Sequence, residues 1–349
     1  MTNIPDLPRR PRSLALAAVL LPALLVTGCA GDVLPGAPPT PTSSDSAYTA
    51  PAEKTLSPLR GESVPAGSVQ NPALSVKVDN HTAARPQVGL ERADIVFEEL
   101  VEGGLTRYVG VWQSDIPEMV GPVRSIRPMD PDIMSSFGGI AAYSGGAQPF
   151  LKLMRATPLV SVVFDTDTTG LFTRTPDRTA PHHVLLNAAE AVARNADLAP
   201  PAQQFAYAPS VAAATAVVDG TATGTMKTRF SPVRWPDWTW NAETSTYLRQ
   251  QEGAPDLDAD GAQLAATNVV VLRVDIDDTY GAIPKTTMID SGEATVAAGG
   301  KSVSATWTKA SPTAAIQLVD AEGVTVRLAP GNTWIELVPG QAGSVELLP

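Results

Sequence analysis

Carboxylates and guanidinium groups are concentrated between residues 74 and 128 of this 349-residue chain. Two of the acids, Glu98 and Glu102, are four positions apart, so in a strand they project from the same face. A buried carboxylate is costly unless it is paired, and arginine can pair with it through two parallel hydrogen bonds. The arginines of the same stretch are Arg85, Arg92, Arg107, Arg124 and Arg127. We therefore predict one loop-bearing edge at which these acids and arginines meet.

Two interpretations need no catalysis. In the first, Glu98, Glu102, Arg107 and Arg124 form a structural network of ion pairs. In the second, the arginines face an anionic ligand, because Arg124 to Arg127 precede a predicted helix whose free backbone N–H groups and dipole favour an anion. The candidate ligand-binding residues are Asn80, His81, Arg85, Glu98, Glu102, Arg107, Arg124, Ser125, Arg127 and His182.

An enzymatic interpretation makes Glu98 or Glu102 the general acid of a hydrolase or lyase that cleaves the glycan of peptidoglycan. Nearby arginines lower the pKa of a carboxylate, which is unfavourable for a general acid at neutral pH. Glu98 and Glu102 are therefore the candidate catalytic residues, although the nearby arginines argue against a general acid.

A nucleophilic interpretation uses Ser125 or Ser144, with His81 or His182 as the base. Neither serine lies in a Gly-x-Ser-x-Gly elbow, so the sequence gives this reading little support. The simpler interpretation of Asn80-His81 is a turn whose side chains cap backbone groups.

The elements that position these residues are short apolar runs next to charged or glycine-rich loops. Strands are predicted over 74–78, 93–101, 107–112, 139–143 and 160–164, and helices over 126–137, 147–154 and 186–197. This alternation predicts an α/β domain, of mixed α+β character, over residues 73–200.

Beyond Pro200-Pro201 the pattern changes to short strand-like runs separated by turn signals such as Gly299-Gly300 and Pro330-Gly331. Strands are predicted over 226–230, 238–249, 269–275, 286–289, 294–298, 302–308, 316–319, 324–328 and 333–338. A mainly antiparallel, β-rich domain is therefore predicted over 201–349. Five of the six tryptophans fall in this half, where we expect them to pack in the core.

The N-terminus predicts an extracytoplasmic location. Residues 1–28 have an arginine-containing start, an apolar run shorter than the roughly 20 residues of a membrane span, and small residues before Cys29, as in a lipoprotein signal peptide. Cys29 is the only cysteine and is the predicted lipidation site, anchoring the chain to a membrane. Residues 29–72 are rich in Pro, Ser and Thr and predict a tether.

Charge and motifs exclude several partners. A formal net charge of −11 disfavours nucleic acid. Three histidines without a fitting spacing, and the absence of any paired-cysteine or phosphate-loop motif, give no support for a metal or a cofactor, so none is expected.

Several motifs resemble the YerB-like family of bacterial lipoproteins. They include Val78-Asp79-Asn80-His81, Ala84-Arg85-Pro86-Gln87, Gly121-Pro122-Val123-Arg124-Ser125-Ile126-Arg127-Pro128 and Pro330-Gly331-Asn332-Thr333-Trp334. The resemblance covers roughly residues 72–340 and implies an N-terminal α/β part, a smaller C-terminal part and a lipid anchor. It implies no defined reaction and supplies no catalytic residue. One departure is His183, where the family pattern leads us to expect Asn.

These observations favour a lipid-anchored protein of the cell envelope that binds an anionic ligand or a protein partner, or acts as a scaffold. The alternatives are the glycan-cleaving enzyme and a purely structural protein. The arrangement of Glu98 and Glu102, in an open cleft or sealed with arginines, distinguishes them.

Overall fold

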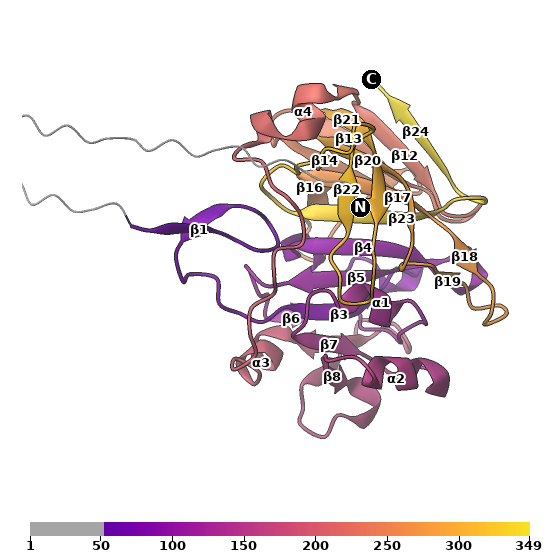
Figure 1. Cartoon of the computed structure of the whole chain (residues 1–349). Helices are drawn as coiled ribbons and strands as arrows, with labels where there is room; N and C mark the ends of the chain where they lie inside the picture. The colour runs from indigo at the N-terminus through magenta and orange to yellow at the C-terminus, as the bar shows by residue number, and fades with distance from the viewer. Residues whose placement is uncertain (1–51) are drawn as a thin grey trace, which may run out of the picture. The chain divides into compact units, whose positions relative to one another are not determined.

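A mixed sheet of 11 strands runs through residues 52–349, the part of the chain that the computed structural model describes (Figure 1). From one edge to the other its strands are β11 (Thr221–Ala222), β21 (Lys301–Thr308), β20 (Ser291–Ala298), β17 (Asn268–Val274), β23 (Thr333–Pro339), β4 (Ile95–Leu100), β5 (Thr106–Trp112), β3 (Leu74–Asp79), β7 (Ile140–Tyr143) and β8 (Val160–Val163), with β22 (Gln317–Val319) paired to β21. The predicted signal peptide, Cys29 and the first part of the tether lie outside the described residues.

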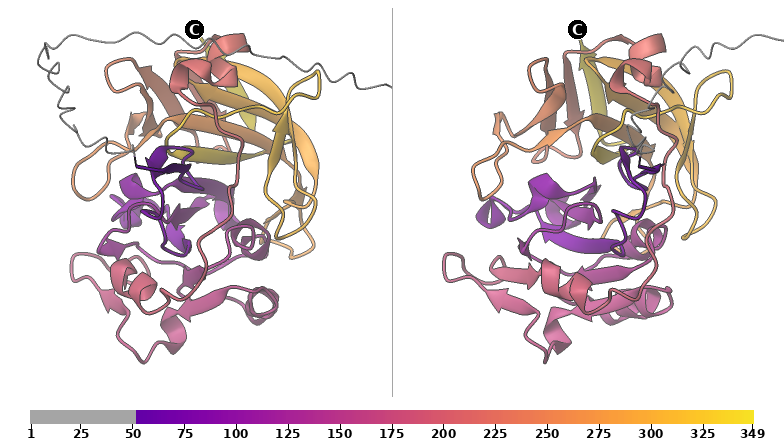
Figure 2. Two further views of the ribbon diagram at one scale, coloured as in Figure 1. Left: turned by 60° about the vertical axis from the view of Figure 1, so that its left-hand side comes forward. Right: turned by 90° about the vertical axis from the view of Figure 1, so that its left-hand side faces the viewer.

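The two halves of the chain join in the middle of this sheet. β23 runs parallel to β4, with Thr333 opposite Ile95 and Glu336 opposite Glu98, and β23 is also parallel to β17. Both views of Figure 2 show the C-terminal strands, in orange and yellow, meeting the N-terminal strands, in purple, along this boundary. The halves therefore share backbone hydrogen bonds and do not stand apart as separate sheets.

A second, six-stranded sheet belongs to the C-terminal half and is antiparallel throughout. Its strands are β15 (Ala254–Pro255), β14 (Thr246–Gln251), β13 (Pro236–Asn241), β12 (Thr225–Arg229) and β24 (Ser344–Leu348), with β16 (Ala265–Ala266) paired to β14. The prediction of a β-rich C-terminal half is confirmed. The single strand predicted over 238–249 was wrong, because a turn in which Ser245 has a φ of 56° divides it into β13 and β14.

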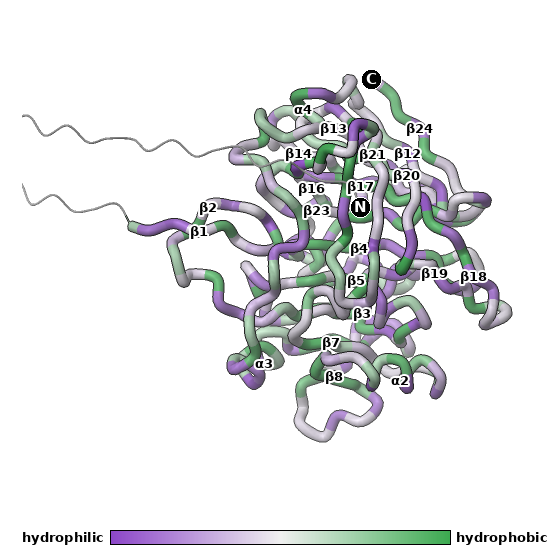
Figure 3. The backbone as a smooth tube through the Cα atoms, in the orientation of Figure 1, coloured by the Kyte–Doolittle hydropathy of each residue, from purple (hydrophilic) through white to green (hydrophobic). Residues whose placement is uncertain are grey.

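Each face of the large sheet packs on a separate hydrophobic core. β5 shows the alternation clearly, because Val109 and Val111 enter one core whereas Tyr108 and Trp112 enter the other. Figure 3 shows green hydrophobic stretches along central strands such as β17, and purple segments around β18 (Ile276–Asp277) and β19 (Lys285–Thr286). Burial on both faces explains the continuous apolar runs in the sequence of these strands.

Helices are short and few in the described residues. They are α1 (Asp130–Met134), α2 (Gln148–Arg155), α3 (Ala188–Ala193) and α4 (Thr215–Asp219). The parallel order β7, α2, β8 is the one clear α/β unit among residues 52–349, and the rest of the N-terminal half is a mixed sheet with small helices, so the predicted α/β alternation is found only in part. The helix predicted over 186–197 is also shorter, because the first of these residues belong to β10 (Val184–Asn187).

The remaining strands are short. β1 (Lys54–Leu56) pairs with β2 (Ser63–Pro65), and β6 (Met119–Val120) and β9 (Phe172–Arg174) flank β10 in a three-stranded sheet. Among residues 52–349, no helix is long and apolar enough to cross a membrane.

Candidate functional site

The parallel strands β3, β7 and β8 end at one edge of the large sheet, and this edge carries the candidate site. β3 and β7 pair over only three residues, and residues 122–126 then lie between their ends. The backbone N–H of Arg124 donates to Lys77 O at 2.8 Å, and that of Ser144 donates to Arg124 O at 2.9 Å. The carboxyl ends of parallel strands are where ligands bind in open sheets with helices, since loops and polar groups converge there.

We call this cluster the arginine edge. Its members are Asp79, Glu102, Arg107, Arg124, Ser125, Arg127, Ser144 and His182.

Arg107 is the least compensated charge of the arginine edge. Only 6% of the residue is exposed, and its Nη1 donates to the carbonyl oxygen of Ser125 at 2.7 Å. Within the described part of the chain no carboxylate oxygen lies within 4.0 Å of its guanidinium nitrogens. Burial, with the charges of Arg127 and Arg124, lowers the pKa of Arg107 to about 10. A guanidinium in such a repulsive environment is stabilised when an anion binds.

Arg127 and Glu102 form a two-pronged ion pair, with Nε donating to Oε2 at 2.8 Å and Nη2 lying 2.8 Å from Oε1. Although burial opposes it, this pairing lowers the pKa of Glu102. Glu102 does not continue strand β4, which ends at Leu100; it begins a turn that Gly103 closes with a φ of 69°. The predicted projection of Glu102 and Glu98 from one strand face was therefore wrong.

One carboxylate oxygen of Asp79 contacts both His182 and Arg124. His182 Nδ1 lies 2.6 Å from Asp79 Oδ2, and Arg124 Nε lies 3.2 Å from the same oxygen. Arg124 Nη1 also donates to Pro181 O at 3.2 Å. The ring of His81 stacks on that of His182, with centroids 4.5 Å apart. Ser125 and Ser144 lie in the same edge and share a hydrogen bond of 3.1 Å between their hydroxyls.

A buried ionic triad lies next to the arginine edge. Lys77 Nζ donates to Glu99 Oε1 and, at 2.8 Å, to Asp130 Oδ1, and all three residues have no exposed surface. Burial, with repulsion from Asp130, raises the pKa of Glu99 to about 8. The raised pKa favours the protonated form of Glu99, and the other oxygen of Asp130 accepts from the backbone N–H of Arg127.

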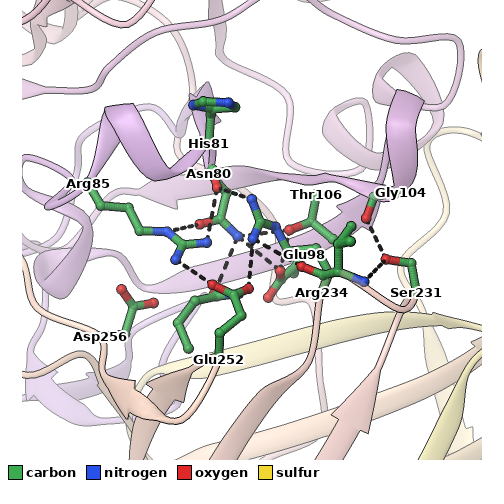
Figure 4. Close-up of polar contacts among 12 residues, drawn as sticks. Asn80, His81, Arg85, Glu98, Gly104, Thr106, Ser231, Arg234, Glu252 and Asp256 are labelled. Carbon is green, nitrogen blue, oxygen red and sulfur yellow. Dashed lines mark hydrogen bonds and ion pairs between the residues drawn. The ribbon is translucent and has the colours of Figure 1, made fainter.

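Glu98 belongs to a different cluster, the junction network, part of which is drawn in Figure 4. The carboxylate has no exposed surface; its Oε1 accepts from Thr106 Oγ1 at 2.6 Å and from Asn80 Nδ2 at 3.1 Å, while Oε2 pairs with Arg249. The ion-pair network predicted for Glu98, Glu102, Arg107 and Arg124 was wrong in its inclusion of Glu98, which pairs with Arg249. A sealed carboxylate is also beyond the reach of a glycan, which argues against Glu98 as a general acid.

Arg249 is the centre of the junction network. It is fully buried, pairs with Glu98 and Asp256, and donates to Gln251 Oε1 at 2.6 Å. Its guanidinium carbon also lies 5.0 to 5.8 Å from the ring centroids of three aromatic residues: Tyr108, Trp238 and Trp334. One cation thus holds acids and rings from both halves of the chain together.

Glu336 completes the junction network opposite Glu98 in the β23–β4 register. Its Oε1 accepts from Trp238 Nε1 at 2.7 Å. Burial, together with the nearby charge of Glu98, raises the pKa of Glu336 well above its ordinary value. The raised pKa favours the protonated form of Glu336, whose Oε2 is buried without a hydrogen-bond partner among residues 52–349.

Asn80 and Arg85 also belong to the junction network. Arg85 Nε donates to Asn80 Oδ1 at 3.0 Å, and both Arg85 and Arg234 pair with Glu252 at 2.7 Å. Figure 4 shows His81 projecting away from these residues. Of the ten predicted ligand-binding residues, the structure thus places Asn80, Arg85 and Glu98 in the junction network, away from the contacts of the arginine edge.

Sequence reasoning missed the charged residues of the C-terminal half and the buried triad. Lys77 was detectable, because it stands in the middle of the apolar strand Leu74–Asp79. Glu336 carried the same signal within the apolar strand β23. Arg249 offered no such signal, since it meets Glu98 only where the second sheet packs on the large one.

The fold and site define a member of a family whose function is undefined. Residues 59–200 match the model described as "Protein of unknown function (DUF3048) N-terminal domain", and residues 226–335 match its C-terminal domain. The chain belongs to this family, and the resemblance to YerB-like proteins is confirmed.

One relative gives the family a named member. The chain is 37% identical over 135 residues to a Bacillus subtilis (strain 168) protein named "Putative lipoprotein YerB". That segment is 38% of this chain and spans 40% of the relative's length. The crystal structure of the YerB protein from Bacillus subtilis has a TM-score of 0.73 over 84% of this chain and all of that chain, at 24% identity, so it shows a shared fold.

Proposed function

We propose that this protein is a lipid-anchored protein of the outer surface of the cell membrane that binds an anionic ligand at the arginine edge. The observation that carries the proposal is Arg107, a nearly buried guanidinium without a carboxylate partner among residues 52–349. Buried arginines are expected to be paired, and a ligand carboxylate or phosphate supplies the missing partner.

The arrangement of the edge also supports an anion. Three arginines, Arg107, Arg124 and Arg127, accompany two carboxylates, Asp79 and Glu102. One positive charge is left over, and the paired hydroxyls of Ser125 and Ser144 add further hydrogen-bond donors for oxygen atoms.

The location rests on the sequence and on the relative. Cys29 follows a signal-like segment, and the related YerB protein carries the word lipoprotein in its name. An anchored domain at this position meets cell-wall polymers, phosphorylated headgroups and envelope proteins, all of which present anionic groups.

The test is thermal stabilisation of residues 29–349, with Cys29→Ser to prevent lipidation, by inorganic phosphate, diethyl phosphate, acetate and muropeptides. A ligand at 100 times its dissociation constant adds about 2.7 kcal/mol to the free energy of unfolding. Arg124→Ala should abolish the shift, because it removes a guanidinium from the edge.

The matched control is Arg92→Ala, which removes an exposed arginine that pairs with Asp115 outside the arginine edge. It should leave the ligand shift intact. Equal shifts in wild type and Arg124→Ala, or no shift with any anion, would show that the edge is not a binding site.

A further inference from the structure

His182 of the arginine edge and its stacked neighbour His81 differ in which ring nitrogen carries the proton. Asp79 Oδ2 is an acceptor, so His182 Nδ1, 2.6 Å away, is the donor, and in the neutral ring the lone pair lies on Nε2. His81 Nδ1 instead accepts from the backbone N–H of Ala83 at 3.1 Å, so its proton is on Nε2. Burial, with the neighbouring His182, lowers the pKa of His81 and favours this neutral form.

Both Nε2 atoms are free to meet a ligand. Within residues 52–349 neither atom has a hydrogen-bond partner, and neither is among the polar atoms sealed from solvent. The stacked pair therefore presents one basic nitrogen, on His182, and one N–H donor, on His81. Their rings lie 4.5 Å apart between centroids and 18° from parallel.

The basic nitrogen belongs to a histidine, His182, that is held next to Arg124 of the proposed anion site. Arg124 approaches the same Asp79 oxygen as His182, at 3.2 Å, and donates to Pro181 O in the residue before His182. Asp79 is 2% exposed, so it positions His182 and keeps its Nδ1 protonated. The guanidinium of Arg124 and the imidazole of His182 are therefore neighbours, held by the same oxygen of Asp79.

We infer that the arginine edge hydrolyses phosphodiesters, with His182 as the general base. The inference rests on the anion binding proposed above and names its substrate class. The single surplus positive charge matches the single negative charge of a phosphodiester, and the arginines, with the N–H of His81, donate to its non-bridging oxygens.

The reaction balances without a further reactant. His182 Nε2 takes a proton from water as the water oxygen bonds to phosphorus. The phosphorus–oxygen bond to the leaving alcohol breaks, and its electron pair stays on that oxygen. The imidazolium of His182 returns the proton to the leaving oxygen, so that a phosphate monoester and an alcohol are released.

The test uses residues 29–349 with Cys29→Ser and follows p-nitrophenolate release from bis(p-nitrophenyl) phosphate. The variant His182→Asn keeps an N–H for Asp79 but has no basic nitrogen. Its turnover should fall at least about 100-fold, the usual contribution of a general base, while diethyl phosphate still binds. His183→Asn, the neighbouring residue that the family pattern expects as Asn, is the matched control and should keep full turnover.

Wild-type protein that releases no p-nitrophenolate, or His182→Asn that is as active as wild type, would overturn the hydrolysis. Anion binding survives that result if diethyl phosphate binds wild type and not Arg124→Ala. Absence of diethyl phosphate binding to wild type would remove both proposals. Cleavage of phosphatidylglycerol vesicles and not of soluble poly(glycerol phosphate) would assign a lipid headgroup, and the reverse would assign a cell-wall polymer.

Discussion

Replacing the buried acid Glu336 with glutamine should leave the protein as stable or make it more stable at neutral pH. The carboxyl of Glu336 accepts from Trp238 Nε1 through Oε1, lies opposite Glu98 in the strand register, and has no hydrogen-bond partner at Oε2 among residues 52–349. A glutamine amide reproduces this arrangement, because its oxygen accepts from Trp238 and its nitrogen takes the place of Oε2. The variant therefore replaces a carboxyl group, which donates a hydrogen bond only when it is protonated, with an amide group, which donates at every pH.

The magnitude follows from proton linkage. The pKa of Glu336 is raised in the folded protein, so the unfolded chain releases a proton that the folded chain keeps. The free energy of unfolding then falls by about 1.4 kcal/mol for each pH unit between the unfolded and the folded pKa. This contribution to stability is complete below the unfolded pKa and is lost as pH rises, and Glu336→Gln removes that dependence.

The assay is urea unfolding of wild type and Glu336→Gln at pH 5, 6 and 7, with the exposed Glu346→Gln of β24 as a control that should change little. As pH rises, the free energy of unfolding of Glu336→Gln should increase relative to that of wild type by about 1.4 kcal/mol per pH unit. A difference that stays constant with pH, or a variant less stable at pH 7 by more than about 2 kcal/mol, would refute a protonated Glu336.

Other substitutions test the remaining charges. Arg249→Met should cost about 3–5 kcal/mol in urea unfolding because it leaves buried carboxylates unpaired, and adding Glu98→Gln should recover part of that loss. A cost below about 1 kcal/mol would contradict the charged network. Glu102→Gln should change stability by less than about 1 kcal/mol, because the Glu102–Arg127 pair is partly exposed, and a larger loss would show that this pair is structural.

Much of the sheet was predictable because its strands are marked by local sequence. The apolar runs of β3, β5, β7 and β17 stand between glycine or charged residues, and the structure confirms them. Strand β24 was missed because Ser344–Leu348 is half exposed at a sheet edge and has no continuous apolar run. Helix lengths were overestimated because Pro131 and the glycine turns limit helical runs that the alanine-rich composition favours.

The candidate site was predictable only in part, for a similar reason. Arg107, Arg124 and Arg127 lie near one another along a chain segment that returns repeatedly to one sheet edge, so their convergence has a local cause. In the sequence, Glu98 resembles these residues, because it is a charged residue of the same segment. In the strand, however, Glu98 and Glu99 point to opposite faces of the sheet, and Glu98 pairs with Arg249, which is 151 residues further along the chain. A partner that comes from a second sheet packed on the first leaves no trace in the sequence near Glu98.

The position of Asp79 and Asn80 shows why the two family domains must act as one unit. Asp79 ends β3 and faces the arginine edge through His182 and Arg124, whereas the next residue, Asn80, donates to Glu98 in the junction network. The backbone oxygen of Asn80 also accepts from Arg234, between β12 and β13, so the C-terminal half helps to hold the end of β3. Removing the C-terminal half would leave β4 without its partner β23 and Glu98 without Arg249. The geometry of the arginine edge therefore depends on both domains, although its own residues all come from the first.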